Sequence, residues 1–358
     1  MTPVAAWQVL REAGIVGGEP PETQDVDSPW YVRAMLGAAG WVAALFLLGF
    51  VYAVIGEDLS HGGMIVAGGV LIAAAAGLLT AGARNDFAAQ LGLAGAFAGQ
   101  GLAFFGLYAT LREMQLGEVG VYLVLAAAEI VLLLAIAHPL HRTWCAFAAA
   151  GFLWFAAGRV VPFATVLLAA AMAVLWLVEL ERPRVHALLA PAAYGVTFAL
   201  LAAEAYRISV YMFLSTFDVR DAPIRLQGLL SPWIGQALMA LVLVGVAWRL
   251  CRRPNLRSTR EQVGAALLAA VLIAMVSRPA PGIISAVMVI VLGFGNGNRV
   301  LAGLGVTSLL AAVFAFYYNL DTTLLVKSGL LAISGVVLLA FRAAVFRWRW
   351  PEAEPGHA

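Results

Sequence analysis

Apolar residues follow one another in long stretches along most of the chain, and polar residues collect between these stretches. A helix needs about 20 apolar residues to cross the hydrocarbon core of a bilayer. The pattern therefore predicts an all-α integral membrane protein with twelve crossing helices. They lie near residues 34–56, 62–83, 87–111, 119–137, 143–158, 160–178, 187–205, 230–248, 263–277, 282–295, 300–320 and 322–341.

Two pairs of these helices are short or interrupted. The pair over 143–178 is broken by Arg159 and Pro162, and the pair over 263–295 by the Pro- and Gly-containing segment 278–282. Each pair predicts either two crossings or two re-entrant pieces, so the count stays between ten and twelve. Interrupted helices also occur at the binding sites of transporters, where helix ends meet the ligand.

The polar segments divide the chain into three parts. Residues 1–33 form an acidic tail, in which helical spacing of apolar residues predicts a short interfacial helix from Pro3 to Ala13. Residues 34–341 form the membrane domain, and residues 342–358 a tail whose start alternates arginines with aromatic residues. The longest external loop is predicted over 206–229, as a lid, a partner surface or a plain surface loop.

Basic residues favour the cytoplasmic side of a membrane. If the N-terminus is cytoplasmic, fifteen of the 22 basic residues fall on the inside. The other seven are Arg112, Arg159, Arg207, Arg220, Arg225, Arg278 and Lys327. This bias predicts that both termini are cytoplasmic, and it assigns the arginine clusters to topology and lipid contact, with no nucleic acid as partner.

The amino-acid composition excludes several other classes of protein. Apolar residues make up 63% of the 358 residues and charged residues 12%, whereas soluble domains have about 25% charged residues. This excludes a soluble or disordered chain, and two cysteines exclude a disulfide scaffold. The five histidines lie in or beside predicted loops, so we expect no metal site and no cofactor. His138 and His141 flank an inside turn and are typical of interface chemistry.

Glu129 is the clearest ionisable residue inside a predicted helix, with Tyr122 on the same face. A charge at the centre of a bilayer costs about 2.5–3.5 kcal/mol on insertion scales, so such a residue is a functional candidate. One interpretation is a proton or cation relay. The other is a protonated, hydrogen-bonded carboxyl that fixes helix packing.

Lys327 is the only lysine of the chain and lies about 9 Å into the last predicted helix, at 1.5 Å per residue. It either extends back to the outer interface or is buried for a function. Thr323 shares its helix face, whereas Asp321 is rotated away from it. A buried Lys327 requires a counter-charge on another helix, and Glu129 and Glu204 are the candidates.

Two further polar features lie among small residues. Gln100 follows a stripe of glycines and alanines that is typical of a close helix contact. Asn296, Asn298 and Arg299 belong to a glycine-rich turn on the predicted inside. Its backbone N–H groups are candidates for anion binding, although Asn-Gly is also ordinary turn chemistry.

The most distinctive phrases are GFGNGNR from Gly293 to Arg299 and AFYYNLDTTLLVKS from Ala315 to Ser328. Together with the segment from Ser28 to Phe50, they make most of the chain resemble the bacterial membrane family called domain of unknown function 4401. The resemblance implies a multi-pass protein of the bacterial inner membrane. It also implies a small membrane-anchored partner with a GDYxxLxY motif, and it supplies no established activity.

Two functions are consistent with these sequence features. The first is a transporter or channel-like protein with a polar site around Glu129 and Lys327. The second is a non-catalytic scaffold or assembly subunit that binds another membrane protein. An enzyme is less expected, because no H-E-x-x-H or G-x-S-x-G motif occurs. The substrate, the coupling ion and the oligomeric state cannot be predicted from these residues.

Overall fold

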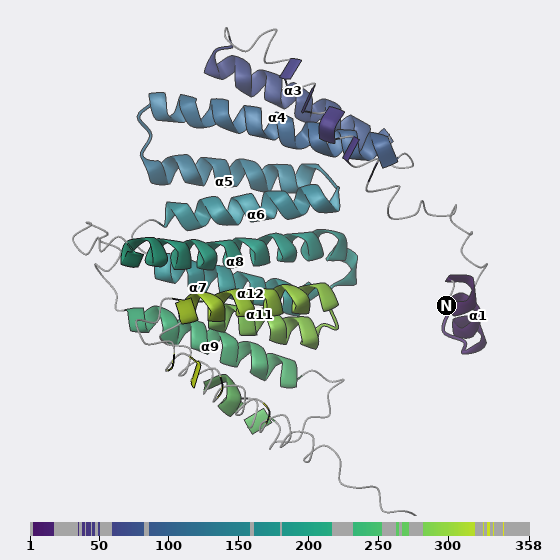
Figure 1. Ribbon diagram of the computed structural model, residues 1–358. Helices are drawn as coiled ribbons and strands as arrows, with labels where there is room; N and C mark the ends of the chain where they lie inside the picture. The colour runs from purple at the N-terminus through teal and green to yellow at the C-terminus, as the bar shows by residue number, and fades with distance from the viewer. Residues whose placement is uncertain are drawn as a thin grey trace, which may run out of the picture. The chain divides into compact units, whose positions relative to one another are not determined.

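The computed structural model describes most of the helical part of the chain (Figure 1). The described residues are 3–17, 59–81, 86–157, 161–179, 181–216, 232–252 and 282–318, with scattered positions within 35–50, 263–271 and 325–339. Every regular element among them is helical, and no strand occurs in these ranges. The predicted all-α class is therefore confirmed for this part of the chain.

The helices have the following bounds: α1 (Pro3–Glu12), α3 (His61–Ala81), α4 (Asp86–Glu113), α5 (Glu118–Ala135), α6 (Pro139–Ala156), α7 (Val161–Glu179), the 3-10 turn η2 (Pro183–Val185), α8 (His186–Thr216), α9 (Pro232–Cys251), α11 (Ile283–Gly295) and α12 (Arg299–Tyr318). Nine of the twelve predicted stretches coincide with one of these helices. The predicted helices at 34–56, 263–277 and 322–341 fall largely outside the described residues.

One predicted boundary is wrong. The loop expected to begin at residue 206 is helical as far as Thr216, because α8 continues through its polar residues. Arg207 pairs with Glu204 one turn earlier, at 2.9 Å, so the charges are satisfied within the helix. Polar residues end an apolar stretch but do not by themselves end a helix.

The chain divides into two compact units, residues 1–117 and 118–358. In the first, α3 and α4 pair closely through glycines. A methyl group added at Gly68 would lie 2.5 Å from the backbone of Gly99 and Ala103, and one added at Gly106 would lie 2.6 Å from the carbonyl of His61. The absence of side chains at these positions lets the two backbones approach.

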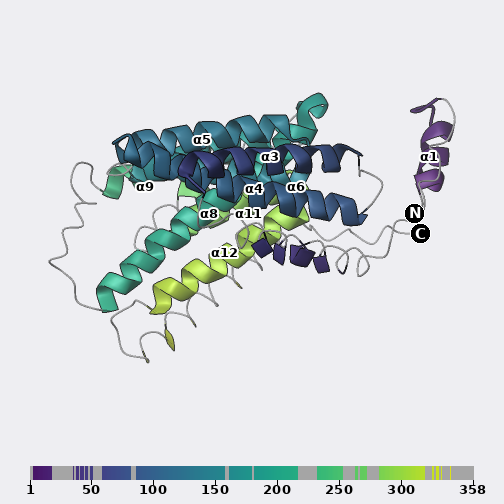
Figure 2. The same ribbon diagram turned by 90° about the horizontal axis from the view of Figure 1, so that it is seen from above.

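The second unit contains α5 to α12. Helix α6 packs between α5 and α8, α7 packs on α8 and α9, and α11 pairs with α12 (Figures 1 and 2). Its core is apolar and includes the fully buried residues Met172, Trp176, Leu200, Leu243, Met288, Leu292 and Leu301. The turns between α5 and α6, between α7 and α8, and between α11 and α12 lie at one end of this unit, on the right in Figure 1.

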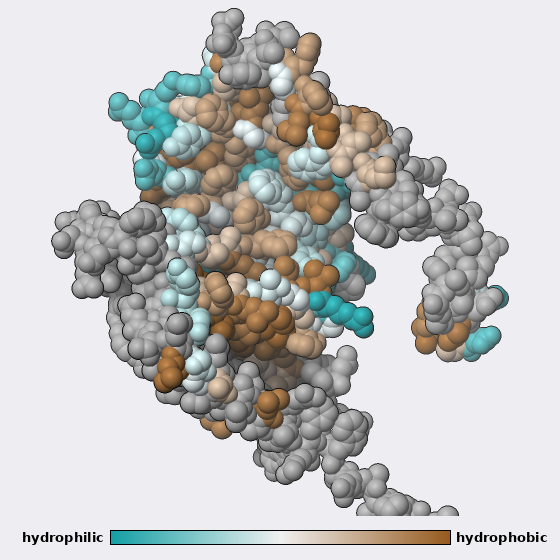
Figure 3. Space-filling model, in the orientation of Figure 1, coloured by the Kyte–Doolittle hydropathy of each residue, from teal (hydrophilic) through white to brown (hydrophobic). Residues whose placement is uncertain are grey.

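The outward faces of these helices are apolar as well (Figure 3). Leu167, Leu241, Leu310 and Phe314 are each at least 65% exposed. A soluble protein rarely exposes contiguous apolar surface of this kind, whereas lipid tails solvate it. Six helices in the described part of the chain are long and apolar enough to cross a membrane: α3, α4, α5, α8, α9 and α12.

Candidate functional site

The turn end of the second unit is held together by side chains that reach from one helix to the next. Arg142, at the start of α6, donates from Nε to the carbonyl of Leu133 on α5 at 3.2 Å and from Nη1 to the carbonyl of Ala187 on α8 at 2.9 Å. On α9, Arg249 reaches Glu181 at 3.3 Å. Arg142 therefore joins the ends of α5, α6 and α8, whereas the Arg249–Glu181 pair lies exposed at the surface.

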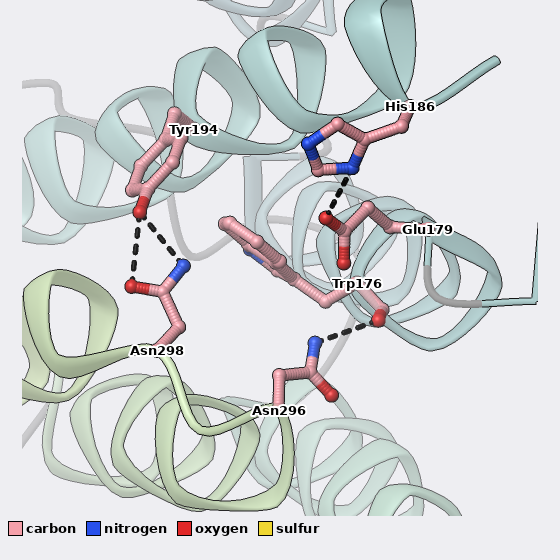
Figure 4. A network of polar contacts seen from close by, with 6 residues as sticks. All are labelled: Trp176, Glu179, His186, Tyr194, Asn296 and Asn298. Carbon is pink, nitrogen blue, oxygen red and sulfur yellow. Dashed lines mark hydrogen bonds and ion pairs between the residues drawn. The ribbon is translucent and has the colours of Figure 1, made fainter. Parts of the chain in front are cut away.

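The turn between α11 and α12 joins this end through its two asparagines (Figure 4). The Nδ2 of Asn296 donates to the carbonyl of Trp176 at 2.8 Å, while its buried Oδ1 has no partner among the described residues. Asn298 exchanges hydrogen bonds with the Tyr194 hydroxyl at 2.7 and 3.0 Å and accepts the N–H of Leu301 at 3.0 Å. Asn298 is therefore the N-cap of α12.

The backbone of this turn is engaged by α11. The N–H groups of Asn296, Gly297 and Asn298 donate to carbonyls of residues 292–294, and Gly297 adopts a φ of 65°. This is a helix C-cap, which uses the N–H groups that an anion would need. The arrangement favours turn chemistry over the anion site considered for Asn296, Asn298 and Arg299; the Arg299 side chain is exposed.

Trp176 links this turn to the core of the second unit. Its indole N–H donates to the Thr197 hydroxyl at 3.0 Å, and its ring meets that of Tyr194 edge to face, with centroids 4.9 Å apart. One turn later, the buried Glu179 carboxylate pairs with His186 at 2.8 Å (Figure 4). These contacts fix α7 against α8 beside the α11–α12 turn.

A second polar cluster lies toward the other end of α8. The Glu204 carboxylate is 4% exposed; it accepts the Ser285 hydroxyl at 2.8 Å on one oxygen and pairs with Arg207 at 2.9 Å on the other. Ser285 lies in the first turn of α11 and is also buried. A buried carboxylate thus meets the beginning of a helix, where backbone N–H groups lack intrahelical partners.

Helix α11 begins inside the second unit. Gly282, its N-cap, has a φ of 91°, and a methyl group there would lie 3.6 Å from Ala312 and 3.7 Å from the Cβ of Glu204. Helix α12 continues to Tyr318 and α8 to Thr216, which is about 9 Å and about 18 Å further at 1.5 Å per residue. The Glu204 cluster is therefore well below the ends of its neighbouring helices.

Glu129 lies within α5 and is 2% exposed. The Tyr122 ring, on the same helix face, stacks on Phe152 and Phe155 of α6, with centroids 6.3 and 5.8 Å away. This stacking and the contact of Arg142 with α5 set the antiparallel register of the two helices. The register places Glu129 at the level of Cys145.

His141 is completely buried within the protein, which the sequence pattern did not predict. Helix α6 begins at Pro139, four residues before the predicted start, which carries His141 into the packed part of the helix. Its Nδ1 lies 3.5 Å from the Sγ of Cys145, one turn later. Burial lowers the pKa of His138, which lies in the connection before α6.

The other predicted residues fall elsewhere. Gln100 is 3% exposed in the first unit, next to Gly99, where an added methyl group would lie 2.7 Å from α3, so the predicted close helix contact is present. Lys327, Asp321 and Thr323 lie outside the described residues. Among the described residues, no three or more His, Cys, Asp or Glu side chains are grouped so as to hold a metal ion.

The sequence pattern did not single out Ser285, Trp176 or Tyr194. Ser285 carried one weak signal, since it is the first polar residue after the Pro- and Gly-containing break at 278–282. Trp176 and Tyr194 are ordinary in apolar helices, and only the packing of α7, α8 and the α11–α12 turn reveals their hydrogen bonds.

Comparison with known proteins gives a family and no activity. The sequence profile of DUF4401, a domain of unknown function, matches residues 29–348. No curated protein and no solved structure matches the chain significantly.

Proposed function

The chain belongs to the DUF4401 family, and for this member we propose a polytopic membrane protein that moves small cations, protons included, through its second unit. The observation that carries the proposal is the Glu204 cluster. A carboxylate is buried in a helix apolar enough to cross a membrane, and it meets the start of a helix that begins inside the unit.

The free-energy cost of burying an ionisable side chain in a membrane helix supports a functional role for the Glu204 carboxylate. Ionisable side chains within membrane helices are expensive, and they typically mark ion pathways and proton relays. Transporter sites are commonly built where a discontinuous helix begins or ends near the middle of the bilayer. Glu129, also buried in a helix of crossing length, provides a second carboxylate.

The finer topology is part of the proposal. We assign about twelve crossings, both termini in the cytoplasm, and the bacterial inner membrane as location. Six of the seven arginines described in the second unit lie at or next to the turn end: Arg142, Arg182, Arg184, Arg249, Arg252 and Arg299. The seventh, Arg207, lies toward the other end and pairs with Glu204. This distribution supports a cytoplasmic assignment for that end, because cytoplasmic loops are enriched in basic residues.

Ion flux into liposomes tests the proposal. The purified chain would be reconstituted with a pH-sensitive dye inside the vesicles, and separately with dyes for Na⁺ and K⁺, under an imposed membrane potential. We expect flux from the wild type and its loss in Glu204→Gln and Glu129→Gln, which remove the charge and keep the shape. Glu181→Gln is the control, since Glu181 is exposed and pairs with Arg249 at the surface.

A scaffold function is the second candidate. It is favoured by the closed geometry of the Glu204 carboxylate, because each oxygen already has a partner within the chain. The small membrane-anchored protein with a GDYxxLxY motif is the partner we propose for it. A wild type that moves no cation, together with a Glu204→Gln variant that only loses stability, would favour the scaffold.

A further inference from the structure

We infer that His138, His141 and Glu129 form the turn-end half of a proton path, so that the cation moved by the second unit is the proton. This inference rests on the proposed function and names its substrate. It concerns the turn end of the second unit, opposite the start of α11. The Glu204 cluster does not account for the titratable residues at that end.

His138 is placed to exchange protons between water and the interior. It lies in the short connection between α5 and α6 and is only half-buried. Its Nδ1 is nevertheless buried and has no hydrogen-bond partner among the described residues. A buried ring nitrogen without a hydrogen-bond partner costs free energy, so its presence at this position points to a role beyond packing.

His141 and Cys145 continue the series into the unit. Residues three and four positions apart on a helix are neighbours on one face, about 5–6 Å apart. His141 is fully buried and its Nδ1 contacts the Cys145 Sγ at 3.5 Å. The α5–α6 register then places Glu129 at the level of Cys145, so the titratable groups follow one another from the turn to the middle of α5.

Imidazole chemistry selects the proton among the cations. A neutral imidazole has one nitrogen that accepts a proton and one that donates, so a proton enters on one nitrogen and another leaves from the second. The ring is then the other neutral tautomer, and a ring flip returns it to the starting state. Burial lowers the pKa of His138, which keeps this ring neutral at neutral pH. Arg142 lies beside them in the sequence, and its guanidinium is bonded to carbonyls of α5 and α8.

The neighbouring helices contribute few other charges. Helix α5 offers Glu129, and α8 offers His186 at its start, where it pairs with Glu179 of α7. No set of three metal-binding side chains occurs among the described residues. A path for protons is therefore better matched to these residues than a site for a bound metal ion.

Proton flux in the liposome assay tests the inference with two variants and a control. His141→Gln keeps the size and polarity of the side chain but cannot relay a proton. His138→Ala opens a space beside water that free imidazole can enter. His61→Gln, at the start of α3 where His61 pairs with Glu113 at the surface, is the matched control. Folding of each variant is checked by its melting temperature and gel-filtration profile in detergent.

We expect proton flux to fall about 100-fold in His141→Gln and His138→Ala, the size of effect that positioned proton-transfer groups typically give. We also expect imidazole in the buffer to restore flux to His138→Ala alone, a result that a merely structural role would not produce. A folded His141→Gln that conducts like the wild type would overturn the inference. If His141→Gln does not fold, imidazole rescue of His138→Ala decides.

The two proposals fail differently. Flux that disappears in Glu204→Gln but persists in both histidine variants leaves the transport function standing and removes the proton path. Wild-type flux of Na⁺ or K⁺ without protons does the same. A wild type that moves no ion removes both.

Discussion

The two units of the chain are both built from closely packed helix pairs, but they differ in what those pairs enclose. In the first unit, Gln100 is the one buried polar residue among the described positions. In the second, seven are buried: Glu129, His141, Thr165, Glu179, Thr197, Glu204 and Ser285. Small residues let helices pack closely in an apolar solvent. Of the buried polar groups of the second unit, the Glu129 and Glu204 carboxylates cost the most to bury, so they call for an explanation beyond helix pairing.

The helix pairs themselves are closely similar. Gly305 of α12 faces α11, where an added methyl group would lie 2.7 Å from Ile290, and Gly92 of α4 faces α3, where it would lie 3.1 Å from Leu79. In the sequence each of these glycines is preceded by a leucine. Close glycine contacts are thus an element shared by the two hairpins, and the α11–α12 hairpin also carries a polar turn.

The largest expected effect tests the shared element. Gly68→Ala and Gly293→Ala each place a methyl group 2.5 Å from backbone of the paired helix, and we expect each to lower the free energy of unfolding by about 3 kcal/mol. Denaturation in detergent micelles measures this decrease in the free energy of unfolding. Gly69→Ala and Gly303→Ala are matched controls, since nothing lies within 4 Å of a methyl group at either position. Equal stability of all four variants would refute glycine-mediated pairing.

The histidine in the connection between α5 and α6 should make stability depend on pH. Burial lowers the pKa of His138 below its ordinary value of 6.5, so the unfolded state binds the proton first as pH falls. Stability should be complete above pH 6.5 and decrease as the pH falls below that value. The difference between wild type and His138→Ala, measured by denaturation across this range, isolates the contribution. A difference that does not change with pH would contradict the burial of a neutral His138.

A substitution in the Glu204 cluster should lower the free energy of unfolding by a smaller amount. Ser285→Ala removes the hydroxyl that donates to the buried carboxylate, and hydrogen bonds to charged groups contribute about 1.5–3 kcal/mol. Thr307→Ala is the control, because Thr307 is exposed and bonds only a carbonyl of its own helix. Unfolding free energies of the two variants should differ by about 2 kcal/mol, and equal values would mean that Ser285 does not hold Glu204.

The sequence was sufficient for the helices and insufficient for the polar contacts between them. Apolar stretches located nine helices because each helix is a continuous apolar run, a feature visible in one stretch at a time, and six of these helices are long enough to cross a bilayer. Hydrogen bonds such as that from Asn296 to Trp176 join residues 120 positions apart, so they depend on packing that no local pattern encodes. The burial of His141 depended on where α6 begins, and helix starts shift by a few residues when a polar residue precedes an apolar run.

The smallest expected effect concerns the turn that distinguishes α11–α12. Asn298→Ala removes the N-cap of α12 and the hydrogen bonds to Tyr194, and an N-cap is typically worth about 1 kcal/mol. Tyr194→Phe removes only the hydrogen bonds and keeps the edge contact of the ring with Trp176. If the turn is tied to α8 through Asn298, the double variant should lose no more stability than Asn298→Ala alone in a denaturation cycle. Additive losses would mean that Asn298 and Tyr194 act separately, and the turn would then be an ordinary helix connection like any that joins two apolar helices.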